Sequence, residues 1–277
     1  MNLIAPQPDQ RPEAWDAHGD DYEAVFEPFS LRFAEAAIRR LALAPGQSVL
    51  DVGAGSGGAA LAMARAGAAV TAVDASAGMC ARIAARAEAS ALPVTATVMD
   101  GQDLGFADAT FDAALSVFGV ILFPDAIKGL AQMRRVTRPG CRVAVVTWTE
   151  PEAYELATEL RVAIAAVRPD LATASLSPQN LPAQLRYRER ADFAALFHAA
   201  GFAGVEIEVC SAALHAPSAR WLGDRLGFAP GMAAQMAGLG ADADAVRQRF
   251  VANLEARHGP GALALGGKAF IGSADRK

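Results

Sequence analysis

Three glycines and two aspartates are the residues of this chain most able to bind a small ligand. Gly53, Gly55 and Gly57 follow an apolar run with the pattern of a strand, and Asp51 directly precedes them. Glycine lets a backbone turn tightly and approach a ligand where a Cβ would clash. Asp74 ends the next apolar run, about 20 residues on, where a carboxylate can accept hydrogen bonds from ribose hydroxyls. This order predicts half of a nucleotide-binding α/β unit.

The same glycines also satisfy a dinucleotide-binding pattern, so an NAD(P)-linked oxidoreductase is an alternative. The pattern is Gly53-x-Gly55-x-x-Gly58. Asp51 argues against that ligand, because a carboxylate beside the loop would repel a pyrophosphate. S-adenosylmethionine instead carries a sulfonium and an ammonium group, which a carboxylate attracts, and a ribose that Asp74 can hold. The residues favour this methyl donor.

Further motifs, in order along residues 47–148, resemble the class I S-adenosylmethionine-dependent methyltransferases. Within them the chain is similar to the small-molecule group that includes the quinone-biosynthesis C-methyltransferases. The matching segments are Leu50-Asp-Val-Gly-Ala-Gly-Ser-Gly57, Asp74, Asp100 after the third strand, Phe111-Asp-Ala-Ala-Leu-Ser-Val-Phe-Gly119 and Val136-Thr-Arg-Pro-Gly-Cys-Arg-Val143. They cover less than half of the chain.

The resemblance implies both a fold and a cofactor. The fold is α/β, with a Rossmann-like, doubly wound sheet of seven strands, mostly parallel with an antiparallel last strand, plus helical lid elements. The cofactor is S-adenosylmethionine, with Asp74 on its ribose and Asp100 near its adenine amino group. The residues expected around it are Asp51, Gly53, Ala54, Gly55, Asp74, Ala75, Met79, Asp100, Gly101, Gln102 and Ser116.

Alternating apolar runs and helical segments agree with a parallel sheet buried on both faces. We predict strands at residues 47–52, 69–74, 94–99, 111–117, 141–148, 205–209 and 262–271. We expect a single domain, in which residues 14–150 form lid helices and the cofactor-binding core. Residues 151–277 complete the sheet, and their segments 151–188 and 216–260 are predicted lid insertions.

The N-terminal region divides into two parts. Residues 1–13 contain three prolines and no periodicity, so we expect them to be mobile. The aromatic residues from Trp15 to Phe29 recur at helical spacing, and Pro28 is expected to break that helix before a second one over residues 32–41. In the resembling family this segment packs over the cofactor as part of a lid. Simple anchoring of the aromatic side chains on the core is the alternative.

No catalytic motif is visible, which agrees with methyl transfer by in-line displacement. A general base is needed only when the acceptor must lose a proton. We name His18 as the candidate base and Tyr22 as a group that positions the acceptor, although a plain exposed helical position is the favoured explanation for His18. Phe118, Tyr154, His215 and Trp221 are candidates for the substrate pocket, with plain packing as their alternative.

The sequence after the fourth strand favours a small-molecule acceptor. Amino-directed methyltransferases that act on nucleic acid or protein often carry Asn/Asp-Pro-Pro-aromatic there, and this chain has Ser116-Val-Phe-Gly119. The net charge of −5, without an extended Lys/Arg cluster, also argues against nucleic acid. A degenerate methyltransferase fold that only binds ligands is a non-enzymatic alternative, which the intact donor motifs disfavour.

The remaining expectations concern metals, location and assembly. The three cysteines and four histidines have no metal-ligand spacing, so we expect no metal. The chain has no signal-peptide pattern and no run of about 18 apolar residues, so we expect a cytoplasmic protein without membrane spans. A homodimer is left open.

Overall fold

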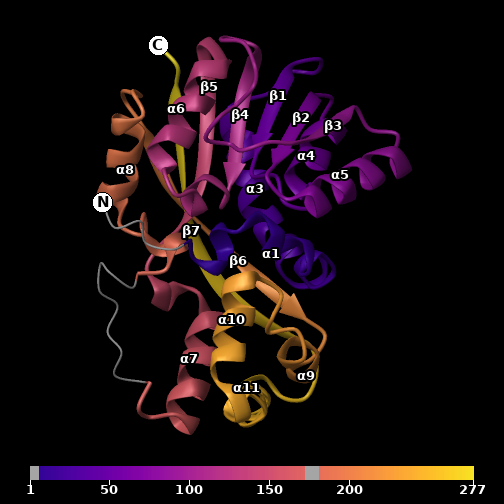
Figure 1. Cartoon of the computed structure of the whole chain (residues 1–277), viewed down its shortest axis with the longest axis vertical. Coiled ribbons are helices and arrows are strands. Elements are labelled where there is room, and N and C mark those ends of the chain that lie inside the picture. The colour runs from indigo at the N-terminus through magenta and orange to yellow at the C-terminus, as the bar shows by residue number, and fades with distance from the viewer. Residues whose placement is uncertain (1–5, 172–180) are drawn as a thin grey trace.

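A seven-stranded sheet organises the computed structural model, which describes residues 6–171 and 181–277 (Figure 1). Its strands lie in the order β3-β2-β1-β4-β5-β7-β6. Strand β7 runs antiparallel to the other six, which all point the same way. The strands are β1 Ser48–Val52, β2 Ala69–Asp74, β3 Val94–Val98, β4 Phe111–Val117, β5 Thr137–Trp148, β6 Glu206–Ala216 and β7 Leu263–Asp275. The predicted doubly wound α/β fold is confirmed.

Helices cover both faces of this sheet. The helices nearest to it are α3 Glu27–Leu41, α4 Gly58–Arg65, α5 Ala77–Ala89, α6 Ala126–Val136 and α8 Arg190–Ala199. A Cβ on Gly267 of β7 would overlap the Phe29 ring of α3, whereas one on Gly272 would meet Phe193 and Phe197 of α8 at 2.8 Å. Side chains five positions apart in a strand point to opposite faces, so α3 and α8 lie on opposite sides of the sheet.

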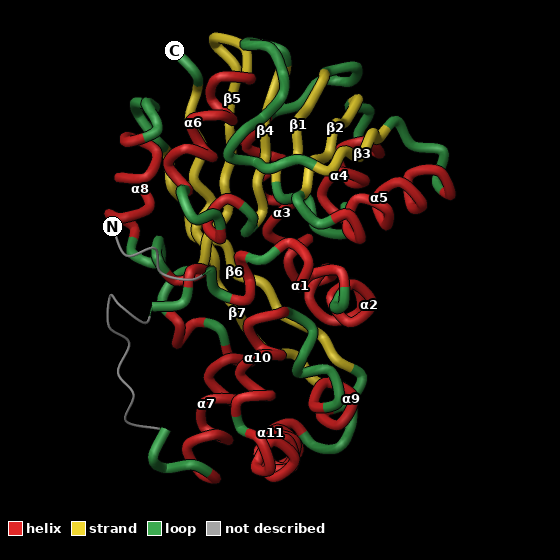
Figure 2. The backbone as a smooth tube through the Cα atoms, viewed as in Figure 1, coloured by secondary structure: helices red, strands yellow, loops and turns green. Residues whose placement is uncertain are grey.

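Strands β6 and β7 are longer than predicted and leave the sheet together as a two-stranded ribbon. Residues 211–216 of β6 pair with residues 263–268 of β7, beyond the last β5 partner, Ala269. Four helices pack around this extension: α7 Glu155–Val167, α9 Ala219–Gly223, α10 Pro230–Gly238 and α11 Ala243–His258 (Figures 1 and 2). No helix in the described part of the chain is long and apolar enough to cross a membrane.

The N-terminal segment is more regular than we expected. It comprises the 3-10 turn η1 Pro8–Gln10, α1 Pro12–Asp16, α2 Gly19–Asp21 and the π-helical turn η2 Tyr22–Phe26, which continues into α3. The expected helix break at Pro28 is wrong. Pro28 lies in the first turn of α3, directly after the π-helical turn, where its missing N–H and fixed φ are tolerated.

Candidate active site

A cavity of about 380 Å³ opens at the carboxyl ends of β1, β2, β3 and β4. This volume lies within the range of roughly 300–1,000 Å³ that is usual for small-molecule sites. Ten of the predicted site residues line it: Tyr22, Gly53, Gly55, Asp74, Ala75, Met79, Asp100, Gly101, Gln102 and Phe118. The sheet brings them together because parallel strands end at a common edge.

The glycine loop wraps closely around the end of β2. The backbone N–H groups of Gly53 and Ala54 donate to the carbonyl of Val73 at 2.9 and 3.1 Å. Gly53 has a φ of +66°, and a Cβ there would lie 2.9 Å from the Cα of Gly119. Gly53 is therefore required twice, for its left-handed backbone and for the close approach of the β4 loop.

Asp74 connects this loop to the following helix. Its two carboxylate oxygens accept hydrogen bonds from the N–H groups of Gly55 and Ser76, both at 2.9 Å. Each oxygen has a second lone pair, so the carboxylate can still accept hydrogen bonds from a ligand in the cavity. Burial raises the pKa of Asp74, and the backbone donors of Ser76 and Gly55 oppose that effect.

Asp51 is a buried carboxylate whose two oxygens have no hydrogen bond of regular geometry within the described chain. Asp51 and Ala54 line a second, small pocket of about 20 Å³. Tyr22 and Gly53 line both this pocket and the main cavity. The pocket has room for about one water molecule. Burial, with repulsion from Asp74 as the smaller cause, raises the pKa of Asp51 to about 7, and the backbone N–H of Ala60 opposes the rise. Such a carboxylate would be stabilised by a cationic group or a hydrogen-bond donor nearby.

Tyr22 separates the two pockets. Its hydroxyl oxygen lies 3.2 Å from the position that a Cβ on Gly55 would take. Burial, and then the charge of Glu27, raise the pKa of Tyr22 well above its ordinary value. A protonated phenol can donate a hydrogen bond at this point. The role of Tyr22 as a group that positions the acceptor stays a prediction.

The turn after β3 forms one end of the cavity. Asp100 Oδ1 accepts hydrogen bonds from the backbone N–H and the side-chain amide of Gln102, at 2.8 and 3.1 Å. Gln102 Oε1 in turn accepts from the N–H of Asp125 at 2.9 Å. A Cβ on Gly101 would overlap the Phe123 ring, so only glycine lets this ring pack against the turn.

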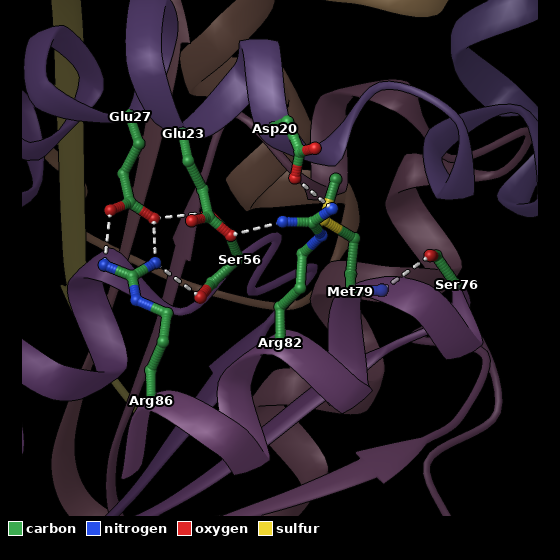
Figure 3. Close-up of polar contacts among 8 residues, drawn as sticks. All are labelled: Asp20, Glu23, Glu27, Ser56, Ser76, Met79, Arg82 and Arg86. Atoms are coloured by element: carbon green, nitrogen blue, oxygen red, sulfur yellow. Dashed lines mark hydrogen bonds and ion pairs between the residues drawn. The ribbon is translucent and has the colours of Figure 1, made fainter. Parts of the chain in front are cut away.

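A row of acids fixes the N-terminal segment to helix α5. Asp16 Oδ1 accepts hydrogen bonds from the Ser76 hydroxyl at 2.5 Å and from the N–H of Gly78 at 2.9 Å. Arg82 pairs with Asp20 at 2.6 Å and with Glu23 at 3.1 Å (Figure 3). These contacts hold the segment against the helix that begins just after Asp74.

Glu27 extends this row to the glycine loop itself. Both guanidinium NH groups of Arg86 donate to the Glu27 carboxylate at 2.7 Å, which is a bidentate pair (Figure 3). The Ser56 hydroxyl donates to Glu27 as well, and Arg86 also donates to the Ser56 carbonyl at 2.8 Å. The three residues join α3, the glycine loop and α5 at one point.

Five predicted site residues line neither the cavity nor the small pocket: His18, Ser116, Tyr154, His215 and Trp221. Ser116 is buried beneath the cavity, with its hydroxyl donating to the Val52 carbonyl and accepting from the N–H of Val120. His18 directly precedes α2 and lines neither pocket, so its role as a base stays a prediction.

Three pocket candidates lie elsewhere for identifiable reasons. Tyr154 stacks on the back of Trp148, with ring centroids 4.7 Å apart, and Trp148 in turn stacks on Phe118 at 4.3 Å. His215 is exposed, because β6 continues to Ala216 instead of ending before it. Trp221 lies in α9, where Arg225 covers its ring at 4.6 Å.

The predicted lid insertions support the N-terminal segment instead of covering the cavity. Among described residues of segments 151–188 and 216–260, none lines the cavity. Phe228 stacks on Phe26 with ring centroids 5.7 Å apart, and Arg225 lies 3.4 Å from Asp21. The N-terminal segment thus forms the cavity wall, and the later insertion packs behind it.

Sequence reasoning missed several residues that line the cavity. They are Asp9, Gln10, Pro12, Met99, Gly119, Leu122, Phe123 and Pro124. Pro8 and Pro12, which contribute to the expectation of mobility, each stand at the start of a helical turn. The preference of proline for the first helical position was the available signal. In the described part of the chain, no group of three or more His, Cys, Asp or Glu side chains could hold a metal ion.

Comparisons with known proteins agree with this geometry. Residues 49–140 match the model of a methyltransferase domain. A demethylmenaquinone methyltransferase of Mycolicibacterium vanbaalenii is 35% identical over 180 residues, covering 63% of this chain and 76% of that protein. Uncharacterized mycobacterial proteins match at 34% identity over 129 residues, and there the chain spans 47% of the relatives' length.

Solved structures share the fold at low sequence identity. Phosphoethanolamine N-methyltransferase 2 of Haemonchus contortus, solved with S-adenosylmethionine, has a TM-score of 0.59 and 17% identity, covering 100% of this chain and 61% of that one. The [4+2]-cyclase SpnF has a TM-score of 0.56 and 19% identity, covering 99% of this chain and 97% of that one.

The residues present fit the methyl donor. The glycine loop leaves space where a Cβ would intrude, Asp74 can accept ribose hydroxyls, and the buried Asp51 carboxylate suits an ammonium group. A pyrophosphate beside Asp51 would be repelled, which disfavours NAD. With the relatives above, the site identifies the chain as a member of the class I S-adenosylmethionine-dependent methyltransferases, with S-adenosylmethionine as its cofactor.

Proposed function

We propose that the chain transfers the methyl group of S-adenosylmethionine to a small, largely apolar or aromatic acceptor. The observation that carries the proposal is the aromatic and apolar lining of the cavity. Trp15, Phe26, Phe118, Leu122 and Phe123 contribute to it, and no Lys, Arg or His of the described chain does. Such a wall favours a flat, uncharged acceptor over a phosphorylated one.

The name of the Mycolicibacterium relative supports an aromatic acceptor, since that protein is a demethylmenaquinone methyltransferase. By contrast, the Haemonchus neighbour was solved with phosphomonomethylethanolamine, whose phosphate would find no cation among the described residues of this cavity. The absence of a nucleic-acid partner, the cytoplasmic location, the single-domain organisation and a homodimer stay predictions.

The side chains divide the work of the reaction. When bound, S-adenosylmethionine supplies a methyl group already activated by the sulfonium charge. Asp74 would hold the ribose, Asp100 would lie near the adenine, and Asp51 would attract the ammonium group. The aromatic residues of the N-terminal segment would align the acceptor and exclude water, which is the main contribution that a protein makes to in-line displacement.

Calorimetry and turnover together test the proposal. Titration with S-adenosylhomocysteine should show one site per chain, and titration with NAD should show none. A panel of phenols, naphthols and hydroquinones should then give S-adenosylhomocysteine release from S-adenosylmethionine. Saturable binding of NAD without binding of S-adenosylhomocysteine would overturn the proposal. Donor binding without turnover on this panel would overturn the proposed acceptor class, and donor binding without turnover on acceptors of other classes as well would favour the ligand-binding alternative.

A further inference from the structure

The 3-10 turn η1 at the N-terminus is held in place from several sides. The Gln7 side-chain amide donates to the Leu181 carbonyl at 3.0 Å, and its oxygen accepts from the N–H of Ala183 at 2.8 Å. The Gln10 amide donates to the carbonyl of Leu122 at 2.9 Å. Both glutamines lie outside residues 49–140, which match the methyltransferase-domain model. These contacts with distant parts of the chain hold the turn at the rim of the cavity.

The turn presents one carboxylate to the cavity. Asp9 lines it, and Asp9 Oδ1 accepts a hydrogen bond from the N–H of Gly231 at 2.6 Å. The Asp9 carbonyl accepts from the indole N–H of Trp15 at 3.0 Å. Asp9 Oδ2 has no hydrogen-bond partner among the described residues, although it belongs to a mostly buried group. One oxygen is thus anchored, and the other lies against Gly231 without a hydrogen-bond donor, in a residue that lines the cavity.

The other acids of the cavity have different positions. Asp74 and Asp100 follow β2 and β3, and each accepts hydrogen bonds from the backbone of its own loop. Among the described cavity acids, Asp9 alone comes from the N-terminal segment, together with the aromatic residues Trp15 and Phe26 of the same wall. His18, our candidate base from the sequence, does not line the cavity. Its charge acts to lower the pKa of Asp9.

We propose that Asp9 binds the hydroxyl group of a phenolic or enolic acceptor and accepts its proton during methyl transfer. This inference rests on the proposed function and names the substrate class of the same site. The acceptor atom forms its bond to the methyl carbon as the carbon–sulfur bond breaks. The acceptor's proton passes to the Asp9 carboxylate, and the electron pair of the broken bond stays on sulfur in the departing thioether.

The surroundings of Asp9 suit this role. Burial raises the pKa of its carboxyl group, while the Gly231 hydrogen bond and the nearby His18 lower it. A carboxylate with a raised pKa is a stronger base, and a positioned general base contributes about 10²–10⁴-fold in rate. The anchored oxygen fixes the position of the carboxylate at the rim of the cavity.

Asp9→Asn separates the chemical role from the structural one. The amide oxygen can still accept the Gly231 hydrogen bond, whereas the amide cannot take a proton. Glu13→Gln, an exposed acid four positions on in α1, is the matched control. The probes are simple phenols and the corresponding thiophenols, because thiophenols are largely ionised in neutral buffer and need no base.

We expect Asp9→Asn to lower turnover of the phenols by about 100-fold or more, and that of the thiophenols only slightly. Its affinity for S-adenosylhomocysteine and its melting temperature should match those of wild type and of Glu13→Gln. Equal losses on both probe series would mean that Asp9 only holds the turn, and would overturn the proposal.

Two further outcomes separate this inference from the proposed function. If wild type binds S-adenosylhomocysteine but neither turns over nor saturably binds any phenol of the panel, the assigned substrate class is wrong and the donor site stands. If wild type does not bind S-adenosylhomocysteine at all, the proposed function itself fails.

Discussion

The two walls of the cavity are built in different ways. The donor wall consists of loops that directly follow β1, β2 and β3, and its geometry is set by backbone hydrogen bonds such as those to Asp74 and Val73. The opposite wall belongs to the N-terminal segment, and side chains fix it to α5, to the glycine loop and to α10. One wall is part of the sheet, whereas the other is attached to it.

This difference predicts how the walls respond to substitution. Strand ends of a buried sheet are rigid, so a change there affects ligand contacts directly. The side-chain contacts of the N-terminal segment are partly exposed, since 31% of the Arg82 side chain and 32% of the Arg86 side chain are accessible to solvent. Partly exposed ion pairs contribute about 1 kcal/mol or less each, so the loss of any one of them should weaken the attachment of this wall only modestly.

Asp74→Ala should have the largest effect, because it acts on the donor wall itself. The variant loses the ribose hydrogen bonds, each worth about 1.5–3 kcal/mol to a charged acceptor, and the two bonds that order the loop. We expect the affinity for S-adenosylhomocysteine to fall by about 100-fold in calorimetry. An unchanged affinity in a folded variant would remove Asp74 from the donor site.

Asp51→Asn should change both binding and the pH dependence of stability. The pKa of Asp51 rises from 3.8 to about 7 in the folded protein. The folded state therefore holds a proton that the unfolded state loses, and the free energy of unfolding falls as pH rises from about 4 to 7. This titration lowers the free energy of unfolding of wild type above pH 7. Asp51→Asn cannot titrate, so its free energy of unfolding above pH 7 should exceed that of wild type by about 2–4 kcal/mol.

The same substitution should weaken binding of S-adenosylhomocysteine by about tenfold, because the ammonium group loses its carboxylate. Melting curves and calorimetry at a series of pH values check both effects. Equal pH slopes for wild type and variant would show that Asp51 does not titrate in this range.

Glu27→Gln should have a smaller effect on the donor, transmitted through the glycine loop. The variant weakens the bidentate pair with Arg86 and the contact with Ser56, so the loop becomes less ordered. We expect about 1 kcal/mol of destabilisation and a several-fold loss of affinity for S-adenosylhomocysteine. Hydrogen exchange of residues 14–29 should also become faster.

Glu35→Gln is the control on the same helix, because Glu35 pairs with Arg32 at 3.4 Å on the surface. It should change stability by less than about 0.5 kcal/mol and leave donor affinity as it is. If both variants behave alike, the Glu27 cluster does not order the glycine loop.

Tyr154→Phe should have the smallest effect of all. The Tyr154 hydroxyl is buried without a hydrogen-bond partner among the described residues, so its removal should leave stability equal or raise it by about 1 kcal/mol. Turnover should stay within about twofold, because Trp148 and Phe118 stand between Tyr154 and the cavity. A large loss of turnover would return Tyr154 to the acceptor site, as the sequence suggested.

The predictions from sequence succeeded where the relevant contacts are local. The run from Leu50 to Gly57 encodes a strand and its glycine loop within eight positions, and Asp74 follows at the end of the next strand. The predictions from sequence failed where the length of a strand depends on the strand that pairs with it. Strand β6 continues to Ala216 because β7 pairs with it throughout, and that pairing places His215 on the surface.

The order of amino acids was therefore enough to predict the sheet, the glycine loop at its carboxyl edge and the family, since hydrophobic period and glycine placement act over short distances. The wall formed by the N-terminal segment could be seen only once the chain was folded. Asp9 reaches Gly231 across 222 positions of the chain, and Tyr22 meets Gly55 through the packing of α3 and η2 on the sheet. No local pattern records such contacts, because each depends on where the whole sheet places two segments that are distant in sequence.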